Sequence, residues 1–232
     1  MENNKVTNHS INPIDPDNLP FIVVEAYKTI RTNIFFALAQ NEKKIITVSS
    51  SVPGEGKSSC ALNLSISFSQ LNEKVLLIDA DLRKPTIYRK LNLENQKGLS
   101  TVLAGFSTVS DSVISINDYL DVLPSGPIPP NPAELLSSPN MVTLLNSLSK
   151  IYKYIVIDTP PINVVTDAVI VAKNTSGLVL IAKHNTTTFD EFDKTIESID
   201  NLKVKLLGVV LNDSLSNSQR YYKHSYYGGY RS

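Results

Sequence analysis

The stretch SVPGEGKS, residues 51–58, constrains the fold of this chain more than any other part of the sequence. It follows the apolar run IITVS and precedes SSCALNLSISFSQL, whose apolar spacing predicts a helix. Except for Ser51 in place of the usual first glycine, it fits the phosphate-binding P-loop pattern between a strand and a helix. The amide groups of such a loop and the N-terminus of the following helix together attract an anion. The stretch therefore predicts a phosphate site.

The charged and hydroxyl side chains of this loop indicate which phosphates it holds. The Lys57 ammonium suits the β- and γ-phosphates of a nucleotide, and the Ser58 hydroxyl suits Mg²⁺. A glycine-rich turn that merely contains a lysine is the simpler interpretation, and the strand–turn–helix context argues against it. The expected nucleotide contacts are Pro53, Gly54, Glu55, Gly56, Lys57, Ser58 and Ser59.

Two carboxylates and a guanidinium follow the next apolar run, in VLLIDADLRKP. Ligands of open α/β sheets bind at the carboxyl ends of the strands, so Asp79 and Asp81 are expected to face the phosphates. We expect this strand to lie next to the P-loop strand. One carboxylate would hold Mg²⁺ or its water, and the other would accept a proton from an attacking hydroxyl. Arg83 would serve a phosphate or a neighbouring acid.

A third carboxylate, Asp158, ends the apolar strand in YIVIDTPP, as in a Walker B element. Many buried strands end in Asp, so this signal is weak alone, but the order and strand-end placement of all three motifs agree. The expected metal ligands are Ser58, Asp79 and Asp158, and the expected catalytic residues are Lys57, Asp79, Asp81, Arg83 and Asp158.

Asn212 ends the last predicted strand, in VKLLGVVLN, on the same side of the sheet. Its amide offers one donor and one acceptor to an adenine edge. A turn residue at the end of a strand is an equally good interpretation.

The alternation of apolar strands with helical patterns predicts the fold class. Continuous apolar strands between helices indicate a buried, mostly parallel central sheet with helices on both faces, an α/β fold of the P-loop NTPase type. No linker divides the core. The expected organisation is a flexible arm over 1–20, one P-loop domain over 21–212, and a flexible tyrosine-rich tail over 213–232.

Composition excludes several classes of protein. Equal numbers of basic and acidic residues, 22 of each, give no electrostatic footprint for nucleic acid. The single cysteine, Cys60, cannot form a disulfide within the chain and suits a reducing compartment. Apolar runs such as LVLIA are much shorter than the roughly 18 residues of a membrane span.

Taken together, SVPGEGKS, LLIDADLRKP and IVIDTPP, with GPIPPNPAELL between the second and third, resemble the bacterial tyrosine kinases (BY-kinases) of capsule and exopolysaccharide synthesis. The chain is most similar to their stand-alone cytoplasmic form in Gram-positive bacteria. The resemblance covers roughly residues 20–232 and includes a terminal tyrosine cluster. It implies an ATP- and Mg²⁺-dependent protein-tyrosine kinase that regulates polysaccharide synthesis and export.

The resemblance also implies partners. Subunits would form a ring, and the tail of one chain would enter the site of the next, with Tyr221, Tyr222, Tyr226, Tyr227 and Tyr230 as phosphate acceptors. The interface helix would present Glu25, Lys28 and Arg31, where Lys28 replaces the family's middle arginine. A transmembrane activator of the polysaccharide co-polymerase type would complete the nucleotide site with its cytoplasmic tail and recruit this cytoplasmic chain to the inner membrane face.

Other functions remain compatible with these motifs. A P-loop switch ATPase would hydrolyse ATP to control a partner, and a nucleotide-binding scaffold would dock one without chemistry. In the switch ATPase the tyrosines would be merely a sticky tail, and in the scaffold the tyrosine cluster would itself dock the partner. A separate alternative is that the tyrosines are aromatic anchors of an interface, a role for which tyrosine is favoured.

Overall fold

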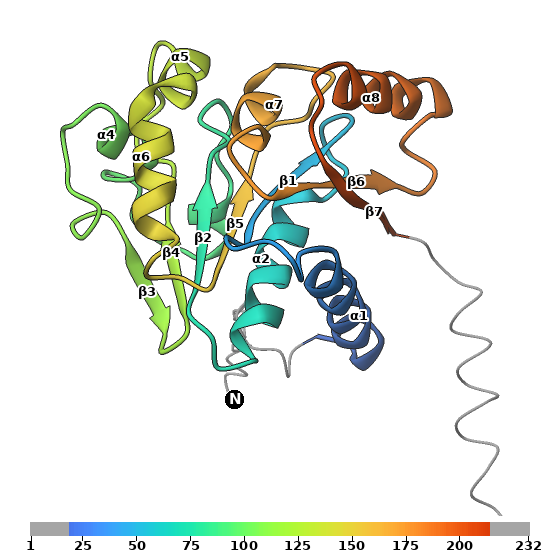
Figure 1. Cartoon of the computed structure of the whole chain (residues 1–232), viewed down its shortest axis with the longest axis horizontal. Coiled ribbons are helices and arrows are strands. Elements are labelled where there is room, and N and C mark those ends of the chain that lie inside the picture. Colours follow the sequence, from blue (N-terminus) through green and yellow to red (C-terminus); the bar gives the residue numbers. More distant parts are fainter. Residues whose placement is uncertain (1–18, 214–232) are drawn as a thin grey trace, which may run out of the picture.

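The computed structural model describes residues 19–213, and the expected terminal segments lie almost wholly outside them. Within these residues the chain alternates between helices and strands, as its apolar periodicity predicts (Figure 1). The strands are β1 (Ile45–Ser50), β2 (Val75–Asp79), β3 (Ile114–Asn117), β4 (Leu120–Leu123), β5 (Tyr154–Asp158), β6 (Gly177–Lys183) and β7 (Leu206–Asn212). The helices are α1 (Phe21–Ala37), α2 (Lys57–Ser69), α3 (Ile87–Lys90), α4 (Leu99–Leu103), α5 (Pro132–Ser137), α6 (Pro139–Leu148), α7 (Asp167–Ala172) and α8 (Phe189–Asn201).

One sheet connects all of these strands in the order β3-β4-β2-β5-β1-β6-β7. Every neighbouring pair is parallel except β3 with β4. The mostly parallel α/β fold of the P-loop type is therefore confirmed.

The expected position of the second motif strand was wrong. β2 does not lie next to the P-loop strand β1, because β5 pairs with both of them and separates them. The chain crosses from β1 through α2 to β2 and leaves the strand position between β1 and β2 open. Strand β5, from a much later part of the chain, fills this position. As a result Asp158 at the end of β5 lies between the P-loop and Asp79, directly opposite Asp79 in the register.

Alternate side chains of the central strands pack on opposite faces of the sheet, as the pleat requires. On one face, Leu77 and Val156 join α1 and α2 in a buried cluster. On the other face, Leu76 and Ile155 join α4, α6 and α7 in a second cluster. α8 covers the β6 end of that face through Ile199. Both faces are covered, which explains why the strands read as continuous apolar runs.

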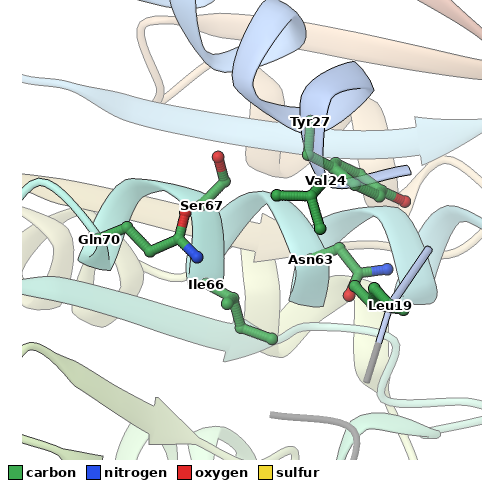
Figure 2. Close-up of a pocket in the computed structure, with 7 residues that line it drawn as sticks. All are labelled: Leu19, Val24, Tyr27, Asn63, Ile66, Ser67 and Gln70. Atoms are coloured by element: carbon green, nitrogen blue, oxygen red, sulfur yellow. The ribbon is translucent and has the colours of Figure 1, made fainter. Parts of the chain in front are cut away.

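Helix α1 lies along α2, and Figure 2 shows the side chains where the two meet. Tyr27, Val24 and Ile66 line a hollow of about 20 Å³ there. A single water needs roughly 10–15 Å³ and ligand sites usually hold roughly 300–1,000 Å³, so this hollow has room for about one water and is too small for a ligand.

Within residues 19–213, none of the helices has the length and apolar character to cross a membrane.

Candidate nucleotide-binding site

The P-loop lies between β1 and α2 with the backbone conformation that its glycines allow. Gly54 and Gly56 have φ of 86° and 90°, values that side chains other than glycine rarely adopt. Among the described residues, no acceptor within the chain takes the amide hydrogens of residues 54–59. These amides lie around the N-terminus of α2, where they are available to an anion, and binding of a phosphate there stays a prediction.

A buried carboxylate holds this loop in shape. Glu55 accepts a hydrogen bond from the Val52 amide at 2.9 Å and another from the Thr187 hydroxyl. Asn212 donates its amide hydrogen to the Glu55 carbonyl oxygen at 2.9 Å and accepts one from the Asp213 amide at 2.9 Å. The Glu55 side chain therefore ties the loop to Thr187 after β6, and the Glu55 backbone carbonyl ties it to Asn212 at the end of β7. Pairing of Asn212 with an adenine edge stays a prediction.

The Lys57 ammonium is the centre of a compact polar cluster. Its Nζ lies 2.8 Å from Asp81 Oδ2, 3.2 Å from Ser58 Oγ and 3.8 Å from Asp158 Oδ1. Burial alone would lower the pKa of Lys57, but the carboxylates of Asp158 and Asp81 outweigh it, so this pKa is raised. The structure thus brings together four predicted site residues from three separate motifs.

Asp158 is the least satisfied member of this cluster. It is fully buried, and neither carboxylate oxygen has a hydrogen-bond partner among the described residues. Burial raises its pKa against the opposing effect of the Lys57 ammonium. A buried carboxylate without a hydrogen bond is costly even beside the Lys57 ammonium at 3.8 Å, and a divalent cation beside Ser58 would satisfy it. The residues present therefore fit Mg²⁺.

Asp79 has different surroundings. Its Oδ1 accepts a hydrogen bond from the Asp81 amide at 3.2 Å, and its Oδ2 accepts those of Thr86 and Ile87 at 3.2 and 3.1 Å. It therefore anchors the loop before α3. Burial raises its pKa, and the adjacent Asp158 raises it further.

These carboxylates do not make a metal site without further ligands. Within residues 19–213, no group of three or more His, Cys, Asp or Glu side chains is placed to hold a metal ion. Mg²⁺ prefers six oxygen ligands and commonly takes several from phosphates and water. A cation here would depend on a nucleotide for its remaining ligands, and metal ligation by Asp79 stays a prediction.

Arg83 reaches a neighbouring acid, one of the two roles expected for it. Its Nε and Nη2 donate to the two oxygens of Asp167 at 2.8 and 3.1 Å. Asp167 is fully buried at the first turn of α7. This bidentate pair connects the loop after β2 to the helix after β5. Sequence reasoning did not find Asp167, because a pairing across 84 residues leaves no local pattern.

Lys90 is a second residue that the motifs did not reveal. Its Nζ donates to Ser59 Oγ at 2.9 Å, and its charge opposes the rise in the pKa of Asp158. It ends α3, the helix that Asp79 anchors, so the same loop places a second ammonium beside the P-loop.

The expected interface residues lie on α1. Lys28 pairs with Glu25 at 2.7 Å along the helix, and Arg31 donates to the Ser67 carbonyl of α2. The five expected acceptor tyrosines lie outside the described residues. The ring therefore stays a prediction.

The sheet, the P-loop amides and the cluster around Lys57 define a P-loop nucleotide-binding protein. A family model described as "ParA: NUBPL iron-transfer P-loop NTPase" matches residues 41–228.

Named relatives narrow this class. Tyrosine-protein kinase YwqD of Bacillus subtilis (strain 168) is 45% identical over 207 residues, which cover 89% of this chain and 85% of the relative. Tyrosine-protein kinase ptk of Acinetobacter johnsonii is 36% identical over 202 residues, covering 86% of this chain but 27% of the relative. The crystal structure of the chimerical protein CapA2B2 superposes with a TM-score of 0.79 at 44% identity, over 83% of this chain and 85% of that one. The chain belongs to the bacterial tyrosine kinase family.

Proposed function

We propose that this chain is an ATP- and Mg²⁺-dependent protein-tyrosine kinase that phosphorylates its own C-terminal tyrosines between subunits and so regulates capsular or exopolysaccharide synthesis and export. One observation carries the proposal. The Asp81 carboxylate lies 2.8 Å from the Lys57 ammonium, at the carboxyl edge of the sheet where the P-loop amides are available to an anion. A proton acceptor therefore lies beside the group that would hold the transferred phosphate.

The reaction assigns a role to each side chain. Asp81 accepts the proton of the tyrosine hydroxyl, whose oxygen attacks the γ-phosphorus as the bond to ADP breaks. Lys57 holds the β- and γ-phosphate oxygens once a nucleotide takes the place of Asp81 as its partner. Asp79 is assigned to positioning, since its oxygens hold backbone amides of the loop that carries Asp81 and Arg83.

Ser58 and Asp158 are the residues that would hold Mg²⁺, and the support is the unpartnered, buried carboxylate of Asp158. When bound, the cation neutralises charge that develops on the phosphate oxygens. Lys90, bonded to Ser59 at the P-loop, would add a second cation beside the phosphates, and Arg83 is assigned to positioning because it pairs with Asp167.

Labelled ATP tests the proposal on the purified full chain, alone and with the cytoplasmic tail of its activator. Wild type is expected to place label on residues 214–232. Lys57→Met is expected to abolish the label because the phosphates lose their cation, and replacement of all five tail tyrosines by Phe is expected to remove the acceptors. Lys150→Met, an exposed lysine after α6, is the matched control and should behave as wild type.

The same assay separates the alternatives. Free phosphate without labelled protein would identify a switch ATPase, and nucleotide binding without either product would identify a scaffold. Label that persists in Lys57→Met would place the activity elsewhere and contradict the proposed site.

We also propose that the chain assembles into a ring through α1 and is recruited to the membrane by a separate transmembrane activator. Absence of a spanning helix among the described residues is compatible with such a partner. In the isolated chain Arg31 already bonds to the Ser67 carbonyl, so a ring contact through Arg31 must share or replace that bond. Light scattering of Glu25→Ala with the activator present is expected to show loss of the ring, and an unchanged mass would refute this interface.

A further inference from the structure

A groove lies between α4 and α5, apart from the phosphate site. Its walls come from residues 100–106 on one side and 127–138 on the other, and they enclose about 580 Å³. That volume lies within the roughly 300–1,000 Å³ usual for ligand sites. Figure 1 shows α4 and α5 next to each other, beside the β4 end of the sheet.

The surface of this groove is apolar and accessible. Phe106 is 85% exposed and Ile128 is 64% exposed, and Pro127, Pro129 and Pro130 lie beside them along the wall. Clusters of exposed apolar side chains commonly mark interaction sites, whereas isolated ones do not. The one charged side chain of the groove is Glu134.

The walls are held rigidly before any ligand binds. Asn95 clamps Gly126 in both directions, donating to its carbonyl at 2.9 Å and accepting from its amide at 2.8 Å. Ser100 donates to the Pro127 carbonyl at 2.7 Å. Gly98 lies so close to Gly126 that a Cβ on Gly98 would lie 2.2 Å from the Gly126 nitrogen. A preformed wall loses little conformational entropy when a ligand binds.

The groove opens on the same edge of the sheet as the phosphate site. Its loop follows β4, and β4 pairs with β2, which ends at Asp79. On its far side α5 packs against α7, whose Asp167 holds Arg83. A peptide in the groove would therefore lie beside the loop that carries Asp81.

We propose that this groove is the docking site for the acceptor segment, residues 214–232 of a neighbouring copy, an inference that rests on the proposed kinase function. The segment carries Arg220, Lys223 and Arg231 and no acidic residue, which complements Glu134. Tyrosine rings pack well on proline and aliphatic surfaces while the hydroxyl stays in water. The acceptor peptide is thus recognised by side chains separate from the nucleotide site.

The position of the chain's end favours a neighbouring copy over the same copy. The described chain ends just after β7, at the edge of the sheet opposite to β3 and β4. From Asp213, eight residues to Tyr221 span at most about 26–29 Å, and 17 residues to Tyr230 at most about 56–61 Å. The seven-stranded sheet is roughly 29 Å wide at about 4.8 Å per strand spacing, so Tyr221 would barely reach the groove of its own chain, whereas a second molecule can bring its groove closer.

Peptide binding tests the inference without any need for catalysis. A fluorescein-labelled peptide of residues 214–232 is titrated with the full chain carrying Lys57→Met, and its anisotropy gives the affinity. Ile128→Asp and Glu134→Lys are each expected to weaken binding by about tenfold or more, the size of a typical interface hot spot. Ile151→Asp is the matched control, because Ile151 is 65% exposed and lies after α6. It should retain the wild-type affinity.

Two further readings complete the test. Thermal melting of Ile128→Asp, Glu134→Lys and Ile151→Asp should match that of their Lys57→Met parent. With Lys57 restored, their binding of a fluorescent ATP analogue should match that of wild type, since these three residues do not belong to the core or the P-loop. In the labelling assay without Lys57→Met, Ile128→Asp is expected to raise the KM for added peptide about tenfold and leave the KM for ATP unchanged.

The outcomes distinguish this inference from the proposed function. Equal peptide affinity in Ile128→Asp and Ile151→Asp would overturn the groove while Lys57-dependent labelling still supported the kinase. Loss of peptide binding in Ile128→Asp alone would support the groove even if no label appeared, in which case the kinase proposal would fail. A change in molar mass at unchanged peptide affinity would show that the groove contacts a folded part of another copy, which also overturns the inference.

Discussion

At the scale of single residues, Asp158 links stability to function. Its folded-state pKa of about 6 lies above the unfolded value of roughly 4, so the folded state holds the proton more tightly. Stability contributed by the protonated form is therefore lost as pH rises through that range. Without a nucleotide, the ionised carboxylate of Asp158 therefore destabilises the folded chain.

Asp158→Asn is accordingly expected to stabilise the nucleotide-free chain at pH 8. Removing a buried charge that lacks hydrogen bonds should raise the melting temperature by about 2–6 °C, a gain of roughly 1–2 kcal/mol, because Lys57 keeps its closer partner Asp81. The gain should shrink at pH 5, where Asp158 itself is protonated. Phosphoryl transfer should fall roughly 10- to 100-fold, as on losing an outer metal partner. Calorimetry at both pH values measures the first effect, with the exposed Asp200→Asn as control. A melting temperature lowered at pH 8 would contradict this account.

Cys60 is expected to be unreactive in the folded chain. It is 3% exposed, and burial raises the pKa of its thiol to about 12, so almost no thiolate exists at pH 8. Iodoacetamide should label it only after denaturation, as mass spectrometry would report. Since the unfolded thiol ionises near pH 8.5 while the folded one keeps its proton, stability should also fall as pH rises above about 9. Rapid labelling of native protein at pH 8 would show that α1 and α2 separate.

At the scale of elements, the contact between the P-loop and the end of β7 can be isolated with two glycines. Gly54 and Gly56 have similar positive φ, but a Cβ on Gly54 meets nothing within 4 Å, while one on Gly56 would lie 2.3 Å from Asn212 Nδ2. Gly54→Ala should therefore cost only the backbone strain, about 1–2 kcal/mol. Gly56→Ala should cost more by about 1–3 kcal/mol, since it also displaces the Asn212 amide from its hydrogen bond.

A double mutant checks that assignment. In the double mutant Gly56→Ala/Asn212→Ala the clash should be absent. Its free energy of unfolding should therefore be close to that of the double mutant Gly54→Ala/Asn212→Ala. Urea denaturation of the nucleotide-free chains gives these values. If Gly54→Ala and Gly56→Ala prove equally destabilising, the contact with Asn212 has no energetic weight.

The elements that the sequence predicts well are those with long apolar patterns. Strands such as 154–158 are buried on both faces, and their hydrophobic runs are a local signal. β3 and α3 were missed because each has only four residues, and β3 is a half-exposed edge strand. Strand order was the larger error, because the position between β1 and β2 is filled by β5 from a remote part of the chain.

In the candidate site, too, some features follow from local sequence patterns and others depend on tertiary contacts. Motif spacing identified Lys57, Asp81 and Asp158, which the fold brings together around one ammonium. It could not assign Asp79 to the loop before α3, nor pair Arg83 with Asp167, because those contacts depend on where separate loops meet. Residue type and spacing predict which groups gather at the carboxyl edge. The partner of each group is decided by the tertiary structure.

At the scale of the whole molecule, net charge is zero but its distribution is uneven. In the groove where the acceptor would bind, the one charged side chain is the acidic Glu134, whereas Asp81 and Asp158 are buried and paired with Lys57. Residues 214–232 carry three cations, Arg220, Lys223 and Arg231, and no acid. Before phosphorylation this charge favours docking of the segment on a neighbouring copy.

Phosphorylation is expected to reverse that attraction and release the segment. Each phosphotyrosine adds about −1.5 to −2 charges, so five of them would change a segment of charge +3 to about −4.5 to −7. Against Glu134, binding of the fully phosphorylated peptide should be at least about tenfold weaker than that of the unmodified one, and the difference should shrink at high salt. Light scattering should show smaller assemblies of phosphorylated than of unphosphorylated chain in the presence of the activator. Identical peptide affinities and identical assemblies would mean that charge on the segment does not govern its release, and an assembly held by α1 alone would then be the simpler description.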